Sequence, residues 1–198
     1  MKKFVLFLAL AIVVSLTTSA QTAKQILDKT AAAMSSKGGA RANFSMSGKY
    51  GNVSGSIAVK GNKFNAYTPA SIVWYDGRTQ WTYMKKTQEV NVSTPTEAQQ
   101  QSINPYKFIY IYKSGYTLSS KAVAGGWQVH LVAQNKSRSI KEMYITVSKG
   151  YKLKQVKMRQ SSGWTTINVI NFRKANLSDS HFRFNSREYP NAEVIDLR

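Results

Sequence analysis

Hydrophobic and polar residues alternate along most of this chain, in short runs that are separated by glycine-containing turns. Phe44 and Met46 alternate with polar neighbours, and the same two-residue period recurs over 57–60, 127–132 and 143–148. Successive side chains of a β-strand point to opposite faces, so each run predicts a strand with one apolar and one polar face. Together the runs predict an antiparallel meander of about ten or eleven strands.

The alternation is weaker in the last third of the chain. Residues 153–158 and 164–172 keep their apolar content but lose the strict period, which predicts a bulge or burial on both faces. The segments 181–184 and 193–197 are expected to form short edge strands.

The stretch 71–83 carries the strongest hairpin signal, because two runs of β-branched and aromatic residues flank Asp76-Gly77. This pair is typical of a two-residue type I′ turn, whose central residues both have positive φ. With these two residues as the loop, Trp74 pairs with Thr79. The hairpin then has four large apolar side chains on one face, either as a packed core or as the wall of an apolar cavity: Ile72, Trp74, Trp81 and Tyr83.

Two parts of the chain have helical patterns. Residues 22–36 place apolar side chains on one stripe, between a threonine N-cap and a pair of glycines. Thr94 and the proline after it predict the start of a short helix over 94–101, and Asn104-Pro105 predicts a second one, apolar almost all round over 106–112. A large antiparallel sheet curls as its twist accumulates, so both parts are natural covers for its concave face.

The first twenty residues have the pattern of a secretory signal peptide. Two lysines precede an apolar run over 4–14, and Thr18-Ser19-Ala20 offers the small residues of a cleavage site. We therefore expect cleavage after Ala20 and export, with residues 21–198 forming a single domain; a retained N-terminal anchor is the alternative. The chain has no cysteine, so neither a disulfide nor a lipidated N-terminal cysteine is available.

The chain is strongly basic. Its formal net charge of +19 becomes +17 when the two leader lysines are removed. Such a charge attracts phospholipid headgroups, lipopolysaccharide phosphates or acidic proteins. Nucleic acid is the usual partner of a basic protein, but the export signal argues against it. A solvated basic surface that keeps the protein soluble is the plainer alternative.

Residues for catalysis are scarce. His130 and His181 are the only histidines, and without cysteine neither a zinc site nor a Cys–His nucleophile is expected. The nine acidic residues are spread thinly, with no pair at the spacing that a glycosidase needs, and there is no glycine-rich phosphate loop. We therefore expect a binding protein without a cofactor or metal. Aliphatic rather than polar neighbours of the rings favour an oily ligand over a base or a sugar.

Four segments share their pattern and order with one known family. Residues 55–60 read Gly-Ser-Ile-Ala-Val-Lys, and residues 76–83 read Asp-Gly-Arg-Thr-Gln-Trp-Thr-Tyr. Asn104-Pro105 opens the central apolar segment, and Phe182 and Phe184 stand two apart near the end. The chain thereby resembles the LolA-type periplasmic carriers of outer-membrane lipoproteins, whose strand Gly-x-Leu-x-Val-Lys, hairpin Asp-Gly-Lys-Thr-x-Trp-x-Tyr, lid helix and final strand match these segments in turn.

The resemblance implies a half-open antiparallel β-barrel, covered by an N-terminal helix and a central helical insertion, whose hollow holds the acyl chains of lipoproteins. It implies an inner-membrane lipoprotein-release ABC transporter as donor and an outer-membrane acceptor, with the protein itself a periplasmic monomer. The family often has an arginine after the Val-Lys pair that latches the lid, where this chain has Gly61-Asn62-Lys63. Lys63 is the candidate substitute, and its ammonium lacks the planar fork of arginine, so we expect a lid that opens more readily.

The acyl cavity that this interpretation predicts is lined by alternating residues of the strands. They are Phe44, Met46, Ile57, Val59, Phe64, Trp74, Trp81, Tyr83, Trp127, Val129 and Ile145. The lid is expected to contribute Ile26, Leu27, Phe108 and Ile109. Ordinary core packing is the alternative for each of them. Two other functions stay open: an exported lipid sensor on the same half-barrel, and an envelope glycan-binding module, which would need polar groups among the rings.

Overall fold

The computed structural model describes residues 21–49, 51–96, 99–100 and 110–198. The predicted leader, residues 1–20, lies outside this part of the chain, as do the predicted lid residues Phe108 and Ile109. The described residues form a mainly β structure with one α-helix, α1 (Ala23–Met34), and three 3₁₀-helices, η1 (Ile111–Lys113), η2 (Asp179–Phe182) and η3 (Ser186–Glu188).

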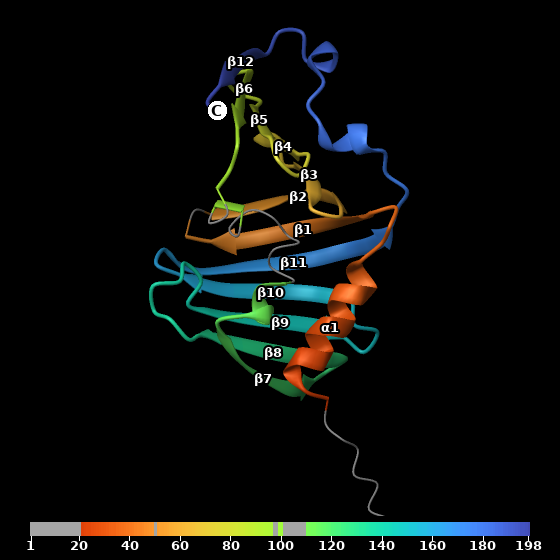
Figure 1. Ribbon diagram of the computed structural model, residues 1–198, viewed down its shortest axis with the longest axis vertical. Coiled ribbons are helices and arrows are strands. Elements are labelled where there is room, and N and C mark those ends of the chain that lie inside the picture. Colours follow the sequence, from red (N-terminus) through yellow and green to blue (C-terminus); the bar gives the residue numbers. More distant parts are fainter. Residues whose placement is uncertain (1–20, 50, 97–98, 101–109) are drawn as a thin grey trace, which may run out of the picture.

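All described strands belong to one sheet of twelve, in the order β12-β6-β5-β4-β3-β2-β1-β11-β10-β9-β8-β7 (Figure 1). Their bounds are β1 (Ala40–Gly48), β2 (Gly51–Lys60), β3 (Lys63–Tyr67), β4 (Ser71–Tyr75), β5 (Gln80–Met84), β6 (Glu89–Ser93), β7 (Tyr116–Val123), β8 (Gly126–Ala133), β9 (Glu142–Ser148), β10 (Leu153–Gln160), β11 (Gly163–Lys174) and β12 (Glu193–Asp196). β7 and β12 are the two edges, so the sheet is open. Every pairing is antiparallel except that of β12 with β6.

The predicted N-terminal helix is confirmed as α1. Thr22 accepts a hydrogen bond from the backbone N–H of Gln25 at 3.2 Å, and the Gln25 side chain accepts one from the N–H of Thr22 at 3.0 Å. This capping box satisfies two backbone donors that a helix otherwise leaves unpaired. α1 crosses the sheet in front of β7 to β10 and packs on it through its buried residues Ile26 and Leu27 (Figure 1).

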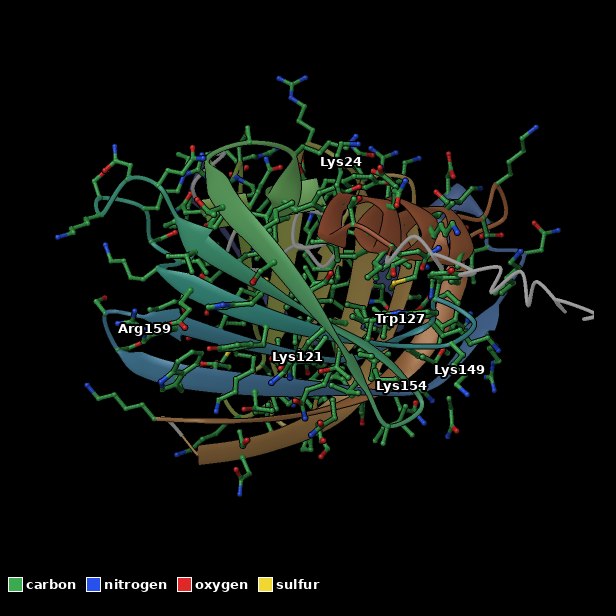
Figure 2. All side chains as sticks on the ribbon, turned by 90° about the horizontal axis from the view of Figure 1, so that it is seen from below. Lys24, Lys121, Trp127, Lys149, Lys154 and Arg159 are labelled. Atoms are coloured by element: carbon green, nitrogen blue, oxygen red, sulfur yellow. The ribbon has the colours of Figure 1, made fainter. Side chains whose placement is uncertain are left out.

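Strand register divides the sheet into two faces, which we call the α1 face and the outer face. The α1 face runs from β8 across to β1 through the successively paired residues Val129, Ile145, Val156, Ile167 and Met46. It continues over β2, β3 and β4 through the pairs Ala40 with Val59, Val59 with Phe64, and Phe64 with Tyr75. Seen along the sheet from the β7 edge, α1 lies within the curve of the strands (Figure 2).

The C-terminal segment differs from the prediction. Residues 193–196 form the edge strand β12 as expected, but residues 181–184 are not a strand, because η2 turns Phe182 into the outer face. Phe182 is fully buried there against Ala58 and Leu177. The segment that contains η2 is therefore held on the outer face by the burial of Phe182, not by pairing as a strand.

The weak alternation of the last third has the predicted cause. The register shifts between Leu153 and Gln155 on β10, and between Arg41 and Asn43 where β1 pairs with β11. Asn171, within β11, has a positive φ of 53°. A bulge turns later side chains relative to earlier ones, which breaks the two-residue period.

The central helical insertion is only partly within the described chain. Thr96, not Thr94, caps a helical turn, since its hydroxyl accepts from the N–H of Gln99 at 3.3 Å and its carbonyl accepts from Gln100 at 2.9 Å. The described part resumes at residue 110, and Tyr112 in η1 is buried against the sheet. Within the described ranges no helix is long and apolar enough to cross a membrane.

Candidate functional site

The predicted wall residues fall on both faces of the sheet. Eight lie on the α1 face, namely Phe44, Met46, Ile57, Val59, Phe64, Trp127, Val129 and Ile145. Trp74, Trp81 and Tyr83 lie on the outer face. Val73 is on the α1 face, so the next residue, Trp74, points to the outer face. Its partner Trp81 shares that face, as does Tyr83 two residues later. The structure therefore brings eight of the predicted residues onto one surface and leaves the hairpin rings on the other.

Under α1 the sheet is densely packed. Val129 and Ile145 have exposed fractions of 0% and 3%, and they share one cluster with Ile26 and Leu27 of the helix. The side chains of α1 thus cover the β8 and β9 part of this face. These four predicted residues are core residues in the described structure.

Beyond α1, the same face keeps apolar side chains that are only half-buried. Phe44 and Met46 on β1 and Ile57 on β2 belong to this group. Trp127 on β8 is also half-buried, but it packs against the cluster under α1 and stacks on Tyr151 at 5.1 Å. The ring of Phe44 lies over Gly55, where an added Cβ would come within 2.9 Å of its Cζ. The lack of a side chain at Gly55 therefore leaves room for the Phe44 ring. Val59 and Phe64 are buried farther along, with the Phe64 ring 5.4 Å from that of Tyr75.

The hairpin loop is longer than predicted. Trp74 pairs with Trp81 and Tyr75 with Gln80, so the loop spans the four residues Asp76 to Thr79. Asp76 Oδ1 accepts hydrogen bonds from the N–H groups of Arg78 at 3.0 Å and Thr79 at 2.9 Å. Only Gly77 of the expected turn pair has positive φ, at 103°, so a type I′ turn is excluded. The register moves by two residues, which leaves the four predicted side chains on one common face.

The hairpin rings pack against the C-terminal segment. The Trp74 ring lies 5.6 Å from Phe184 and 5.5 Å from Tyr189, and Tyr83 lies 4.8 Å from Tyr189. Periodicity could not reveal this, because Phe184 and Tyr189 lie in irregular chain. The only sequence signal was the pair of phenylalanines at 182 and 184.

Within the described residues, Lys63 binds the C-terminal segment. It points to the outer face, and its Nζ lies 2.7 Å from Asp179 Oδ2. Lys60 Nζ lies 3.0 Å from Asp179 Oδ1 and donates to the Leu177 carbonyl at 2.8 Å. Lys63, followed by Lys60, holds the pKa of Asp179 below its usual value. The two lysines therefore fasten η2 to the sheet, while the predicted contact of Lys63 with the lid falls outside the described residues.

A buried tyrosine joins α1 to the end of the central segment. The Tyr112 hydroxyl donates to Asp28 Oδ1 at 2.6 Å. Desolvation, followed by this carboxylate, raises the pKa of Tyr112, while hydrogen bonds from Lys24 and Tyr112 lower the pKa of Asp28. Tyr112 was not singled out in the sequence, where it is one aromatic residue in an apolar run. Its role depends on a contact between residues far apart in the chain.

The acidic and histidine residues of the described chain form no metal site. No group of three or more His, Asp or Glu side chains gathers there. His130, on the outer face as expected, stacks on Tyr144 at 4.3 Å and contacts Glu142 at 2.8 Å. Arg159 Nε also donates to Glu142, at 3.0 Å. This carboxylate therefore ties together neighbouring strands.

Comparison with known proteins gives the family and the fold. The family model described as outer membrane lipoprotein carrier protein LolA matches residues 13–162. A solved structure of an uncharacterised conserved protein from Thermus thermophilus has a TM-score of 0.60 at 13% identity, over 89% of this chain and 99% of that one. Among curated proteins, none matches this chain.

Two further solved structures are similar at lower TM-scores. A LolA superfamily protein from Nitrosomonas europaea has a TM-score of 0.46 at 13% identity, over 83% of this chain and 99% of that one. A putative outer membrane lipoprotein-sorting protein domain from Vibrio parahaemolyticus has a TM-score of 0.45 at 11% identity, over 79% of this chain and 94% of that one. The family match spans well over half of the sequence and agrees with the open sheet crossed by one helix. The chain therefore belongs to the LolA family of outer membrane lipoprotein carrier proteins.

Proposed function

We propose that this protein binds the acyl chains of lipoproteins on the α1 face and carries them from the inner to the outer membrane. The observation that supports this most directly is the half-buried apolar surface beside α1, formed by Phe44, Met46 and Ile57. A sheet that needed only a core would bury these side chains as fully as Val129 and Ile145. Membership of a lipoprotein carrier family supports this choice of ligand class.

The physical need for such a surface is large. Each CH₂ removed from water is stabilised by about 0.8 kcal/mol, so long acyl chains do not leave a bilayer unless another apolar surface receives them. That surface must be nearly as favourable as the bilayer but not much better, or the cargo would stay bound. An open sheet edged by β7 and β12 can expose and cover its apolar face without breaking a closed barrel.

The proposal includes the place of action and the partners. The protein acts in the periplasm after cleavage following Ala20, receives acylated lipoproteins from an inner-membrane ABC transporter and delivers them to an outer-membrane acceptor. The basic character of the chain suits docking on acidic protein surfaces. Half-buried rings on the α1 face would contact the acyl chains, and Ile26 and Leu27 would hold α1 in place as their cover.

Substitution on the two faces tests where the acyl chains bind. Met46→Gln places a polar amide on the α1 face, whereas Ile170→Gln makes a similar change at an outer-face residue of the neighbouring strand β11, which is 47% exposed. We expect Met46→Gln to weaken binding of a fluorescent fatty acid or a triacylated peptide about tenfold, since about 1.4 kcal/mol of apolar contact is lost. Ile170→Gln should bind like the unmodified protein.

Equal binding by both variants, with both folded by circular dichroism, would contradict binding on the α1 face. Native mass spectrometry of protein isolated from the periplasm identifies the cargo, and we expect bound lipoprotein. Depletion of the protein from cells should leave lipoproteins in the inner membrane. Normal lipoprotein sorting after depletion would contradict the carrier role, even if lipid binding were retained.

A further inference from the structure

We propose a second binding site, on the outer face, for a saccharide that carries a phosphate group. It lies between the sheet and the C-terminal segment 178–189, on the opposite side of the sheet from the proposed acyl-binding surface. One end is a basic pocket and the other is a cleft with aromatic and polar walls. The two hollows share Asn65 and His181 as lining residues, so they lie next to each other.

The basic end places two arginines together without a counter-ion. Arg41 on β1 and Arg173 on β11 are directly paired across the strands, and both line a pocket of about 220 Å³. Neither has an ion pair with any other described residue. Like charges directly opposite one another destabilise a sheet. A bound anion removes this repulsion, and guanidinium groups match the oxygens of phosphate with paired N–H donors.

The backbone at this end is irregular in a way that shapes the pocket. The register between β1 and β11 shifts right after Arg41, and Asn171, which also lines the pocket, has a positive φ of 53°. Bulges of this kind reorient side chains and are frequent beside binding sites. His181 closes the pocket from the C-terminal segment. Burial, followed by the charge of Arg41, lowers the pKa of His181, so near pH 7 its neutral imidazole can donate or accept a hydrogen bond.

The other end combines rings with polar groups. A cleft of about 700 Å³ lies between β3, β4 and the C-terminal segment, with Trp74, Tyr67 and Tyr189 among its walls. Polar side chains line the same cleft, including Asn185 and Glu188, which are hydrogen-bonded to each other. Sugars present apolar ring faces edged by hydroxyls, so aromatic surfaces next to amide and carboxylate groups match them. Aliphatic side chains also lie beside the hairpin rings, with Val90 and Val92 paired with Tyr83 and Trp81 and Ile72 lining the cleft, but here polar side chains share the cleft with the rings.

Tyr67 is the ring most accessible to a ligand. It is 47% exposed, and Lys85 Nζ lies 3.7 Å from its centroid. Trp74 is buried by comparison, at 7%. We therefore assign the phosphate to Arg41 and Arg173, the first sugar contacts to Asn65 and His181, and the far side of the sugar to Tyr67.

The test compares two double variants that remove equal charge. Arg41→Gln/Arg173→Gln removes the basic end, while Lys121→Gln/Lys149→Gln removes two exposed lysines at the β7 end of the sheet (Figure 2). Calorimetry with glucose 1-phosphate, glucose and inorganic phosphate measures the affinity of each protein. Binding is followed in parallel by the NMR indole signal of Trp74, assigned with Trp74→Phe.

We expect the unmodified protein to bind glucose 1-phosphate more tightly than either glucose or inorganic phosphate. Arg41→Gln/Arg173→Gln should weaken this binding at least about tenfold, because it removes the charge-assisted contacts, and the lysine variant should stay within about twofold. Tyr67→Ala should weaken binding of the sugar phosphate but not of inorganic phosphate. Absence of glucose 1-phosphate binding, or equal loss in both double variants, would overturn the proposal.

Two further measurements identify the source of the sugar and separate this site from the acyl surface. Sedimentation of the protein with phosphatidylcholine vesicles containing lipid A, reduced more by the arginine than by the lysine variant, would identify a lipid headgroup. Binding of soluble glucose 1-phosphate without such sedimentation would identify a free sugar phosphate. Fatty-acid binding should be unchanged in Arg41→Gln/Arg173→Gln. Loss of fatty-acid binding in this variant would contradict two independent sites, and failure of the carrier role would leave the outer-face result intact.

Discussion

Single residues of the hairpin illustrate how far local chemistry reaches. Asp76 and Gly77 mark the turn correctly, because an aspartate side chain can accept backbone hydrogen bonds from the residues that follow it and glycine tolerates positive φ. The same properties serve a two-residue and a four-residue loop, so local signals did not decide between them. Asp76 Oδ2 also accepts a hydrogen bond from Arg183 Nε at 3.2 Å, a contact with a distant residue that local signals do not contain.

Removing the Asp76 side chain should destabilise the protein. Asp76→Ala loses both backbone hydrogen bonds of the loop, at about 1 kcal/mol for each, whereas Asp76→Asn keeps the oxygen that accepts them. We expect the free energy of unfolding to fall by about 1–2 kcal/mol in the alanine variant and by less than half as much in the asparagine variant. Urea unfolding measures both. Equal losses would mean that the exposed pair with Arg183, and not the loop geometry, supports the turn.

At the scale of elements, the conformation of the segment after β11 is determined by tertiary contacts rather than by local propensity. Phe182 is buried on the outer face, and Lys60 and Lys63 hold Asp179 beside it. Nothing local in 177–184 distinguishes a packed crossing segment from an edge strand, because both need alternate apolar side chains. The nearby lysines of the turn between β2 and β3 supply the difference.

The attachment of η2 should weaken in acid. The pKa of Asp179 is lowered by Lys63 and Lys60, so its contribution is complete above the unfolded-state pKa and is lost as the pH falls through the lowered one. We expect faster amide hydrogen exchange over 177–184 at low pH than the change in pH alone would cause. Asp179→Asn should show fast exchange there at neutral pH. Lys24→Gln, which breaks a pair within α1, is the matched control and should leave this segment unchanged.

The contact between α1 and η1 predicts a second effect at this scale. Tyr112→Phe removes a hydrogen bond to the Asp28 carboxylate from a side chain that is 4% exposed. The free energy of unfolding should fall by about 1.5–3 kcal/mol, as for other hydrogen bonds to charged groups. Asp28→Asn retains an acceptor and should cost less. If Tyr112→Phe were neutral in thermal unfolding, the hydrogen bond to Asp28 would contribute nothing to holding α1 on the sheet.

At the scale of the whole molecule, charge is distributed unevenly along the chain. Glu142 is the only acidic residue from 98 to 178, a region that is rich in lysine and arginine. This region contains β7 to β11. Because Glu142 is already paired with Arg159 and His130, it leaves the other cations of these strands without a carboxylate nearby in sequence.

We expect the protein to associate with anionic surfaces in a manner that depends on salt. Vesicles that contain phosphatidylglycerol should sediment the protein at low ionic strength and release it at about 0.5 M salt, where the screening length is only a few ångströms. Vesicles of phosphatidylcholine alone are the control. If retention on phosphatidylglycerol did not change with salt, charge would not be what draws the protein to the membrane.

Much of the architecture follows from the sequence alone. The two-residue period predicted the strands, the threonine N-cap and apolar stripe predicted α1, and the hairpin motif placed the aromatic rings together on one face. These features depend on residues close in sequence, where side-chain spacing and backbone preference suffice. For the same reason, the common face of the eight wall residues from β1, β2, β3, β8 and β9 could be predicted without any knowledge of tertiary contacts.

Only the tertiary structure determines which side chains of a strand point to the α1 face and which to the outer face. Val73 and Tyr75 are as apolar as Ile72 and Trp74, so alternation in β4 could not say which pair would face α1. Both sets are covered, Val73 and Tyr75 by neighbouring strands on the α1 face and Trp74 by the C-terminal segment, which lies more than a hundred residues away in the chain. Periodicity determines which residues of a strand share a face, but packing between distant segments determines what each face contacts.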